Sequence, residues 1–97
     1  MSNYQEIYDA IRDRAVLSIS YSGSIRIIEP HLIGVTMADN VALSAYQVEA
    51  PSGVGFRLFV VDDIAAIERT GENFEEPRPG FNPNDQTMKE VLTSILD

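Results

Sequence analysis

The segment Arg26-Ile27-Ile28-Glu29-Pro30-His31 is the central feature of this chain. It lies between an apolar strand, predicted over residues 15–21, and a hydrophobic hairpin further along. Because Pro30 has no N–H to donate to a neighbouring strand, we expect the chain to turn a corner there, with one strand before it and a new strand after it. Arg26 and His31 have the two most chemically capable side chains in a region whose other residues are suited to packing.

Upstream of this segment, the sequence predicts an amphipathic helix from Ser2 to about Arg14. Ser2 and Gln5 have the spacing of a capping box. Apolar residues recur at helical spacing behind it, namely Tyr4, Ile7, Tyr8 and Ile11.

Alternating apolar and polar residues, separated by turn residues every six to ten positions, predict short antiparallel strands on both sides of the segment. The strands are expected over residues 15–21, 25–28, 32–37, 41–48 and 56–61. Residues 38–40 should form the turn of a hairpin, since Asp and Asn tolerate tight turns. Residues 49–55 form a loop that either connects two strands at the surface or acts as a lid.

The last third of the chain predicts less regular structure. Asp62 and Asp63 should cap a short helical turn over residues 64–67 that ends at Thr70-Gly71. Residues 72–83 should be irregular and pinned to the surface by Phe74 and Phe81. A final helix is expected from about residue 86 to 96. Its apolar stripe is either core or a dimer seam and consists of Met88, Val91, Leu92, Ile95 and Leu96.

These elements predict a mainly β fold, a small SH3-like or Sm-like barrel of about five antiparallel strands with an N-terminal and a C-terminal helix. We expect one domain, because 97 residues with 44% hydrophobic content can build only one sizeable core. Its β-rich part should span residues 1–74. Residues 75–97 should form an irregular segment and a helix packed on the same domain.

Composition narrows the classes of function. The absence of cysteine excludes disulfides and thiolate metal sites. No apolar run approaches the ~20 residues of a spanning helix, and the N-terminus is polar, so we expect a cytoplasmic protein with no membrane partner.

The net charge of −8 argues against a broad nucleic-acid surface, which needs clustered Lys and Arg. The charge is unevenly spread. Residues 1–61 hold six acidic and four basic residues, net −2, whereas residues 62–97 hold nine acidic and three basic residues, net −6. A small anion pocket in the β-rich part remains compatible with this distribution.

Two arginines lie in apolar strands. Arg26 either grips a phosphate or carboxylate with its two-pronged guanidinium, or pairs with an acid of this chain or reaches solvent. Arg57 shares a strand face with Phe59 and Val61, where an unpaired charge is costly. Its partner should be an acid of this chain, a carbonyl group or a ligand.

His31 is the only histidine, so a multi-His metal site is excluded. It is either a corner histidine hydrogen-bonded to backbone or a ligand contact with a pH-sensitive charge. Asp62 and Asp63 fit a helix cap better than a Ca²⁺ loop. Strand aromatics either stack on bases or belong to the core, and these are Tyr21, Tyr46 and Phe56. No catalytic residue, metal site or cofactor is predicted, and we expect no enzyme.

Taken together, several segments resemble the WYL domain family. They are Ala10-Ile11-Arg12, Leu17-Ser18-Ile19-Ser20-Tyr21, Arg26-Ile27-Ile28-Glu29-Pro30-His31, Leu43-Ser44-Ala45-Tyr46 and Phe56-Arg57-Leu58-Phe59, followed by Asp62 and Ile64. The resemblance covers about Ile7 to Phe74. In one respect the chain departs from the family, because the Trp-Tyr-Leu signature aligns with Val41-Ala42-Leu43, which keeps only the Leu.

The resemblance implies a bacterial or phage regulatory module with an SH3-like or Sm-like barrel. WYL domains usually accompany a winged-helix DNA-binding domain and sense a ligand, often nucleic acid or a nucleotide. By resemblance, the ligand-binding residues would be Arg26, His31, Tyr46 and Arg57. The leading hypothesis is a small anionic ligand, a nucleotide or a short single-stranded nucleic acid. The alternative is a protein-interaction or oligomerisation module, such as a homodimer, acting through the acidic C-terminal third.

Overall fold

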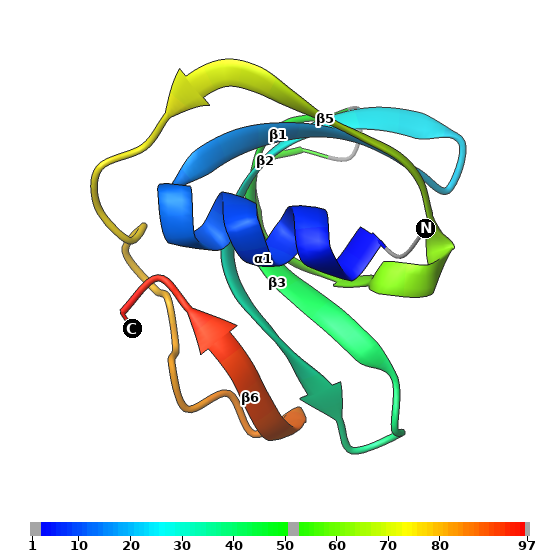
Figure 1. Ribbon diagram of the computed structural model, residues 1–97, viewed down its shortest axis with the longest axis vertical. Helices are drawn as coiled ribbons and strands as arrows, with labels where there is room; N and C mark the ends of the chain where they lie inside the picture. Colours follow the sequence, from blue (N-terminus) through cyan, green and yellow to red (C-terminus); the bar gives the residue numbers. More distant parts are fainter. Residues whose placement is uncertain (1–2, 51–52, 97) are drawn as a thin grey trace.

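Six antiparallel strands and one N-terminal helix make up the part of the chain that the structure, a computed structural model, describes, residues 3–50 and 53–96 (Figure 1). The elements in chain order are α1 (Asn3–Asp13), β1 (Ala15–Tyr21), β2 (Ser24–Thr36), β3 (Val41–Glu49), β4 (Gly55–Val60), a 3-10 turn η1 (Val61–Asp63), β5 (Ile64–Asn73) and β6 (Met88–Ser94). The predicted N-terminal helix is confirmed as α1. Ser2, half of the predicted capping box, lies outside the described residues.

The strands form one bent sheet in the order β4-β3-β2-β1-β5, with β6 added to β2. β2 is its central strand. It pairs with β3 along one edge, and along the other it pairs first with β1 and then with β6. The mainly β, antiparallel prediction is confirmed. Within the described residues the hydrogen-bonded path runs from β4 to β5 without closing on itself.

β2 continues through Pro30, so the prediction of two separate strands at this corner was wrong. The corner is instead an irregularity in one long strand, where the pairing with β3 shifts register between Pro30 and Leu32. On the opposite edge, the last pair with β1 is at Ile28 and the first pair with β6 is at Leu32. Pro30 therefore falls where β2 changes partners, a position at which a missing N–H is tolerated.

The predicted C-terminal helix is also wrong, because residues 88–94 form strand β6. β1 leaves the edge of β2 after Ile28, and β6 pairs with the part of that edge beyond it. Gly34 permits the close approach, since a Cβ there would lie 2.5 Å from the Glu90 carbonyl oxygen. Met88 and Ile95 are buried while Val91 is 44% exposed. The predicted helical stripe, and a dimer seam along it, therefore do not form.

The predicted helical turn over residues 64–67 was wrong as well. The one helical turn there is η1, and Ile64 begins strand β5. β5 pairs with β1 from Ile64 opposite Tyr21 to Asn73 opposite Ala15, so Thr70-Gly71 does not end the element. The free edge of β1 is satisfied by this pairing, which outweighs the local helix signal. Six strands result where about five were expected.

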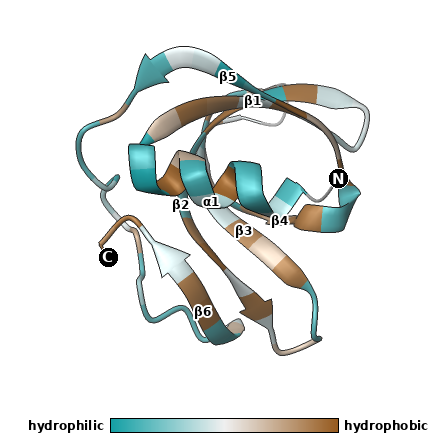
Figure 2. Ribbon diagram, in the orientation of Figure 1, coloured by the Kyte–Doolittle hydropathy of each residue, from teal (hydrophilic) through white to brown (hydrophobic). Residues whose placement is uncertain are grey.

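The core lies between α1 and the concave side of the sheet. β1 and β5 pass on one side of α1 and β3 and β6 on the other (Figure 1). Figure 2 shows hydrophobic residues, in brown, along β1 and β6 and on alternate turns of α1. The helix buries Ile7, Ala10 and Ile11 completely. In residues 3–50 and 53–96 every helix is too short or too polar to cross a bilayer.

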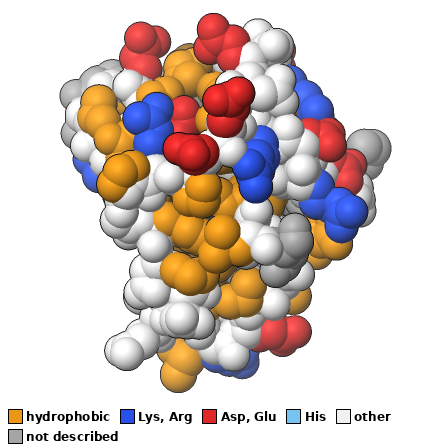
Figure 3. Space-filling view, turned by 90° about the vertical axis from the view of Figure 1, so that its left-hand side faces the viewer, with side chains coloured by type: hydrophobic (Ala, Val, Ile, Leu, Met, Phe, Trp, Pro, Cys, Tyr) orange, Lys and Arg blue, Asp and Glu red, His pale blue; other side chains and the backbone are white. Residues whose placement is uncertain are grey.

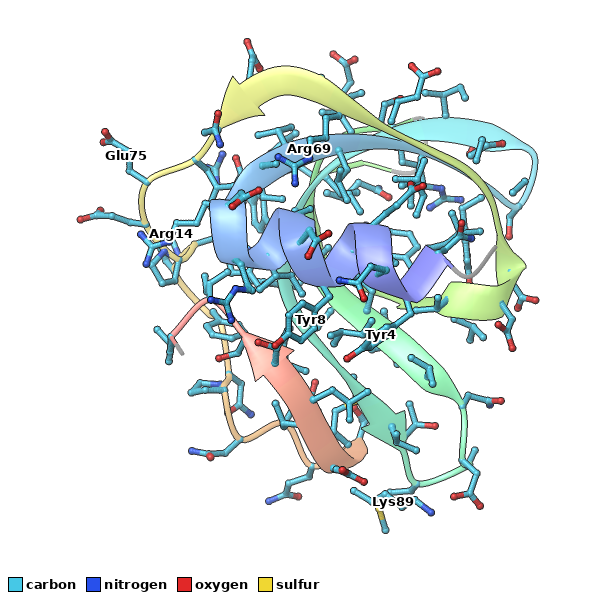
Figure 4. The ribbon with its side chains drawn as sticks, in the orientation of Figure 1. Tyr4, Tyr8, Arg14, Arg69, Glu75 and Lys89 are labelled. Carbon is cyan, nitrogen blue, oxygen red and sulfur yellow. The ribbon has the colours of Figure 1, made fainter. Side chains whose placement is uncertain are left out.

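Arg14 ties the irregular segment after β5 to the end of α1. Its φ of 54° turns the chain out of the helix into β1. Its carbonyl accepts the Phe74 N–H at 3.0 Å, and its guanidinium donates to the carbonyls of Glu75 and Ile95 (Figure 4). Phe74, Glu75 and the residue after β6, Ile95, are thereby held against Arg14.

Candidate functional site

The four predicted ligand-binding residues divide between the two faces of the sheet. Tyr46 lies opposite Phe56 in the β3–β4 pair, and Arg57 lies opposite Ala45. Since successive strand residues point to opposite faces, Tyr46 and Arg57 project in opposite directions. Arg26 pairs with the buried Ile19 and so shares the inner face with Arg57. The structure therefore does not bring all four residues into one pocket.

On the inner face, Arg26 is held by Gln47. Its Nη1 donates to Gln47 Oε1 at 3.1 Å, and its Nε donates to the Tyr21 carbonyl at 3.4 Å. The guanidinium lies 5.5 Å from the Tyr21 ring centroid and 5.8 Å from that of Phe59. These contacts are stabilising, because the negative face of an aromatic ring attracts a cation. Arg26 is thus fixed in direction by an amide and two rings.

Arg57 lies beside Gly55, the strand partner of Gln47. A Cβ at Gly55 would be 3.1 Å from Arg57 Nη1, so the guanidinium lies directly over Gly55. Arg57 Nη1 donates to the Phe56 carbonyl at 2.9 Å, which makes a carbonyl group one of its partners, as the sequence allowed. We call Arg26, Gln47 and Arg57 the two-arginine cluster.

Gln47 is the member of this cluster that sequence reasoning missed. It is fully buried, and its Nε2 donates to the Gly53 carbonyl of the loop after β3. The sequence does contain a sign of this role. Gln47 is a polar residue at a position where the alternation of residues 41–47 predicts a buried side chain. Pro51 and Ser52, on which the lid interpretation of this loop partly rests, lie outside the described residues.

The chemistry available to the two-arginine cluster is anion binding. Both guanidiniums present several N–H donors in a plane, which suits phosphate and carboxylate oxygens. Partial burial strengthens such contacts relative to open water. Both arginines are half-buried in the sheet.

On the outer face, His31 is the centre of an aromatic cluster. The ring is fully buried. It stacks on Phe74 with centroids 5.3 Å apart, and it meets Phe56 and Phe81 at 5.2 and 5.1 Å. Phe74 and Phe81 thus hold the irregular segment on the sheet, which confirms that prediction. We call Glu29, His31, Tyr46, Phe56, Phe74, Arg78 and Phe81 the His31 cluster.

Both ring nitrogens of His31 are hydrogen-bonded to backbone. Nδ1 lies 2.7 Å from the Glu29 carbonyl oxygen, and Nε2 accepts the Arg78 N–H at 3.0 Å. The interpretation as a corner histidine bonded to backbone is confirmed. Burial lowers the pKa of His31 below its ordinary value, and this outweighs the opposite effects of the Glu29 carbonyl and carboxylate.

Arg78 completes the outer cluster and was not anticipated from the sequence. It donates to both carboxylate oxygens of Glu29, at 2.7 and 2.9 Å, and its guanidinium lies 4.6 Å from the Tyr46 ring centroid. The hydrogen bonds to Glu29 raise the pKa of Arg78. Tyr46 and His31 are connected through Phe56, but residues 74–81 cover them. The available signal was Glu29, an acid in a central strand that requires a basic partner.

The remaining candidates have structural positions. Tyr21 packs edge-on against Phe59 at 4.9 Å, and its hydroxyl accepts the Val60 N–H. Asp62 and Asp63 are exposed in η1. In the part of the chain that the structure describes, no three His, Asp or Glu residues are grouped to hold a metal ion.

Comparison with protein-family models, with curated proteins and with solved structures found no significant match. The resemblance to WYL domains therefore stays a prediction from the motifs, and the function rests on the geometry described above.

Proposed function

We propose that this chain is a non-enzymatic, WYL-like ligand-sensing module that binds a small anionic ligand, a nucleotide or a short single-stranded nucleic acid. The observation that carries the proposal is the two-arginine cluster. Arg26 binds the buried Gln47, Arg57 lies over the partly buried Gly55, and Gln47 and Gly55 form one register pair of β3 and β4. Two guanidiniums at one register pair favour an oxyanion over a neutral ligand.

Each residue has a separate role in this proposal. Arg26 and Arg57 neutralise phosphate or carboxylate oxygens, and Gln47 sets the direction of Arg26. His31 and Tyr46, the other two residues implied by the resemblance, would contact a ligand only after residues 74–81 move off the outer face. The SH3-like or Sm-like barrel type belongs to the same proposal.

Fluorescence anisotropy with labelled single-stranded DNA and RNA tests it, with nucleotides as competitors. Arg26→Ala with Arg57→Ala should abolish binding without unfolding the domain. The matched control is Arg12→Ala with Arg69→Ala, which removes the same charge from exposed positions. Native binding should weaken with salt, because bound phosphates release counterions. Equal loss in both double variants, or no binding by the native chain at any salt, would refute the proposal.

One observation favours the alternative of a protein-interaction module. β6 lies at an edge of the sheet, because within the described residues its only sheet pairing is with β2, and its residues 89–91 are exposed. Val91 and Leu96 are 44% and 57% exposed near that edge. Figure 3 shows hydrophobic side chains gathered on the side of the molecule where the C-terminal end lies.

Sedimentation velocity at micromolar concentration separates the two functions. A dimer that becomes monomeric in Val91→Lys with Leu96→Lys would support the interaction module. A monomer in both the native chain and the double variant would count against homodimerisation through this edge.

A further inference from the structure

Residues 74–81 cross the outer face of β2, β3 and β4 and are held there by few polar contacts. The Phe74 N–H donates to the Arg14 carbonyl, and the Arg14 guanidinium donates to the Glu75 carbonyl. The Arg78 guanidinium pairs with Glu29, and the Arg78 N–H donates to His31. The Phe81 N–H returns to the Arg78 carbonyl at 3.1 Å, so the segment makes a turn at this point. Among the described residues of the strands, His31 is the titratable side chain that bonds the backbone of this segment directly.

The hydrogen bonds define the protonation state of His31. A carbonyl oxygen only accepts, so Nδ1 must carry the proton that is shared with Glu29. Nε2 accepts the Arg78 N–H, so it must be unprotonated. Only the neutral imidazole satisfies both contacts. A second proton on Nε2 would point at the Arg78 N–H across 3.0 Å and would leave that N–H without its acceptor.

We propose that His31 is a pH-sensitive latch, whose neutral form holds residues 74–81 on the outer face of the sheet and whose protonation releases them. The latch is a property of the His31 cluster and goes beyond the proposed ligand binding at the two-arginine cluster.

The charges around His31 do not stabilise its protonated form in place. Glu29 of β2 attracts a proton on the ring, but both of its carboxylate oxygens already bind Arg78. Arg78, from the segment itself, repels that proton. β3 contributes Tyr46, whose ring centroid lies 4.6 Å from the Arg78 guanidinium, and β4 contributes the uncharged Phe56. From the end of β6, the Ile95 N–H donates to the His31 carbonyl and not to its ring.

The direction of the effect follows from linkage. Burial lowers the pKa of His31 in the covered state, whereas the uncovered ring should have a pKa near 6.5. Protons therefore bind the open state more tightly. The covered state is fully favoured above pH 6.5 and loses stability as the pH falls from there toward the lowered pKa. Within that window the open fraction should rise by about tenfold per pH unit.

Hydrogen exchange of the full chain between pH 7.5 and 5, corrected for the intrinsic pH dependence of exchange, tests the latch. Protection of amides in residues 74–81 should fall by up to about tenfold per pH unit below pH 6.5, while amides of β3 keep theirs. His31→Gln should remove this dependence, because a glutamine amide can donate to Glu29 and accept from Arg78 without titrating.

Glu29→Gln is the matched control. It weakens the contact with Arg78 but keeps the bond from the Arg78 N–H to His31. Protection of the segment should fall by a similar factor at every pH, and the slope should persist. A slope that is absent in the native chain, or equal in His31→Gln, would overturn the proposal.

NMR of the native chain keeps the test valid if His31→Gln does not fold. Since the chain has one histidine, its ring nitrogen signals are assigned without ambiguity. Protonation of Nε2 should occur in the same transition as the shift of the Arg78 amide, with the sheet still folded. A ring that stays neutral until the whole chain unfolds would overturn the latch.

Discussion

Glu29 and Arg78 meet across 49 positions of sequence through two parallel hydrogen bonds of 2.7 and 2.9 Å. The two partners differ in exposure, since the Glu29 side chain is 8% exposed and that of Arg78 is 42% exposed. Removing Arg78 therefore leaves a buried anion, whereas removing Glu29 leaves a partly solvated cation. The pair holds the irregular segment over the central strand.

Arg78→Met should destabilise the fold more than Glu29→Gln. The first change leaves a buried carboxylate without its cation, at a cost of about 2–3 kcal/mol, whereas the second keeps a hydrogen-bonding amide and costs about 1 kcal/mol. Urea denaturation at pH 7.5 measures both. Equal losses would show that burial of Glu29 does not determine the energy of the pair.

Gln47→Glu should weaken anion binding, and circular dichroism checks that the variant is folded, because the new carboxylate would also face the Gly53 carbonyl oxygen that now accepts from Nε2. The new carboxylate would replace the amide oxygen that Arg26 binds at 3.1 Å and would repel an anionic ligand. We expect affinity in the anisotropy titration to fall by at least about tenfold. Gln86→Glu adds the same charge at an exposed position and serves as the control. Unchanged affinity in Gln47→Glu would place the ligand elsewhere.

Gly34→Ala should separate β6 from β2. Its Cβ would lie 2.5 Å from the Glu90 carbonyl oxygen, which is backbone and cannot rotate away. We expect a loss of about 2–3 kcal/mol in the free energy of unfolding. Val91→Thr, at a half-exposed position of the same strand, should change it by only about 0.5 kcal/mol. A tolerated Gly34→Ala would contradict the close contact between these strands.

The free energy of unfolding should fall as the pH drops below 6.5. Burial lowers the pKa of His31 in the folded state, so the unfolded state binds the proton more tightly and gains population as protons are added. The contribution of His31 is at most about 1.4 kcal/mol per pH unit. Urea denaturation between pH 7.5 and 5.5 should show this slope in the native chain and a flatter one in His31→Gln. The same slope in both would assign it to other groups.

Local features of the sequence predicted the elements that form through local contacts. The spacing of Ile7 and Ile11 predicted α1, and Asp39, with its φ of 66°, allows the turn between β2 and β3 that its residue type predicted. Arg26 and Arg57 were identified because a cation in an apolar strand needs a partner. These inferences succeeded because helical periodicity and turn geometry depend on neighbours within a few residues.

The errors arose where long-range pairing decided the structure. Met88, Val91 and Ile95 fit a helix by spacing, but β2 offered an open edge beyond Ile28, and pairing with it satisfied more backbone groups than the sequence pattern could reveal. The four predicted ligand-binding residues lie on two faces of the sheet for a related reason. The register of β3 with its neighbours placed Tyr46 on one face and Arg57 on the other, and no spacing in the sequence predicts such a register.

By itself, the sequence determined a cysteine-free, mainly β chain with an N-terminal helix and two arginines in apolar strands. Only the tertiary structure decided that Gln47 brings Arg26 to the same register pair as Arg57, and that Arg78 covers His31 and pairs with Glu29. The physical reason is that composition and periodicity record each residue's local preference. Burial, hydrogen-bond partners and pKa shifts depend instead on which distant segments the folded chain brings together.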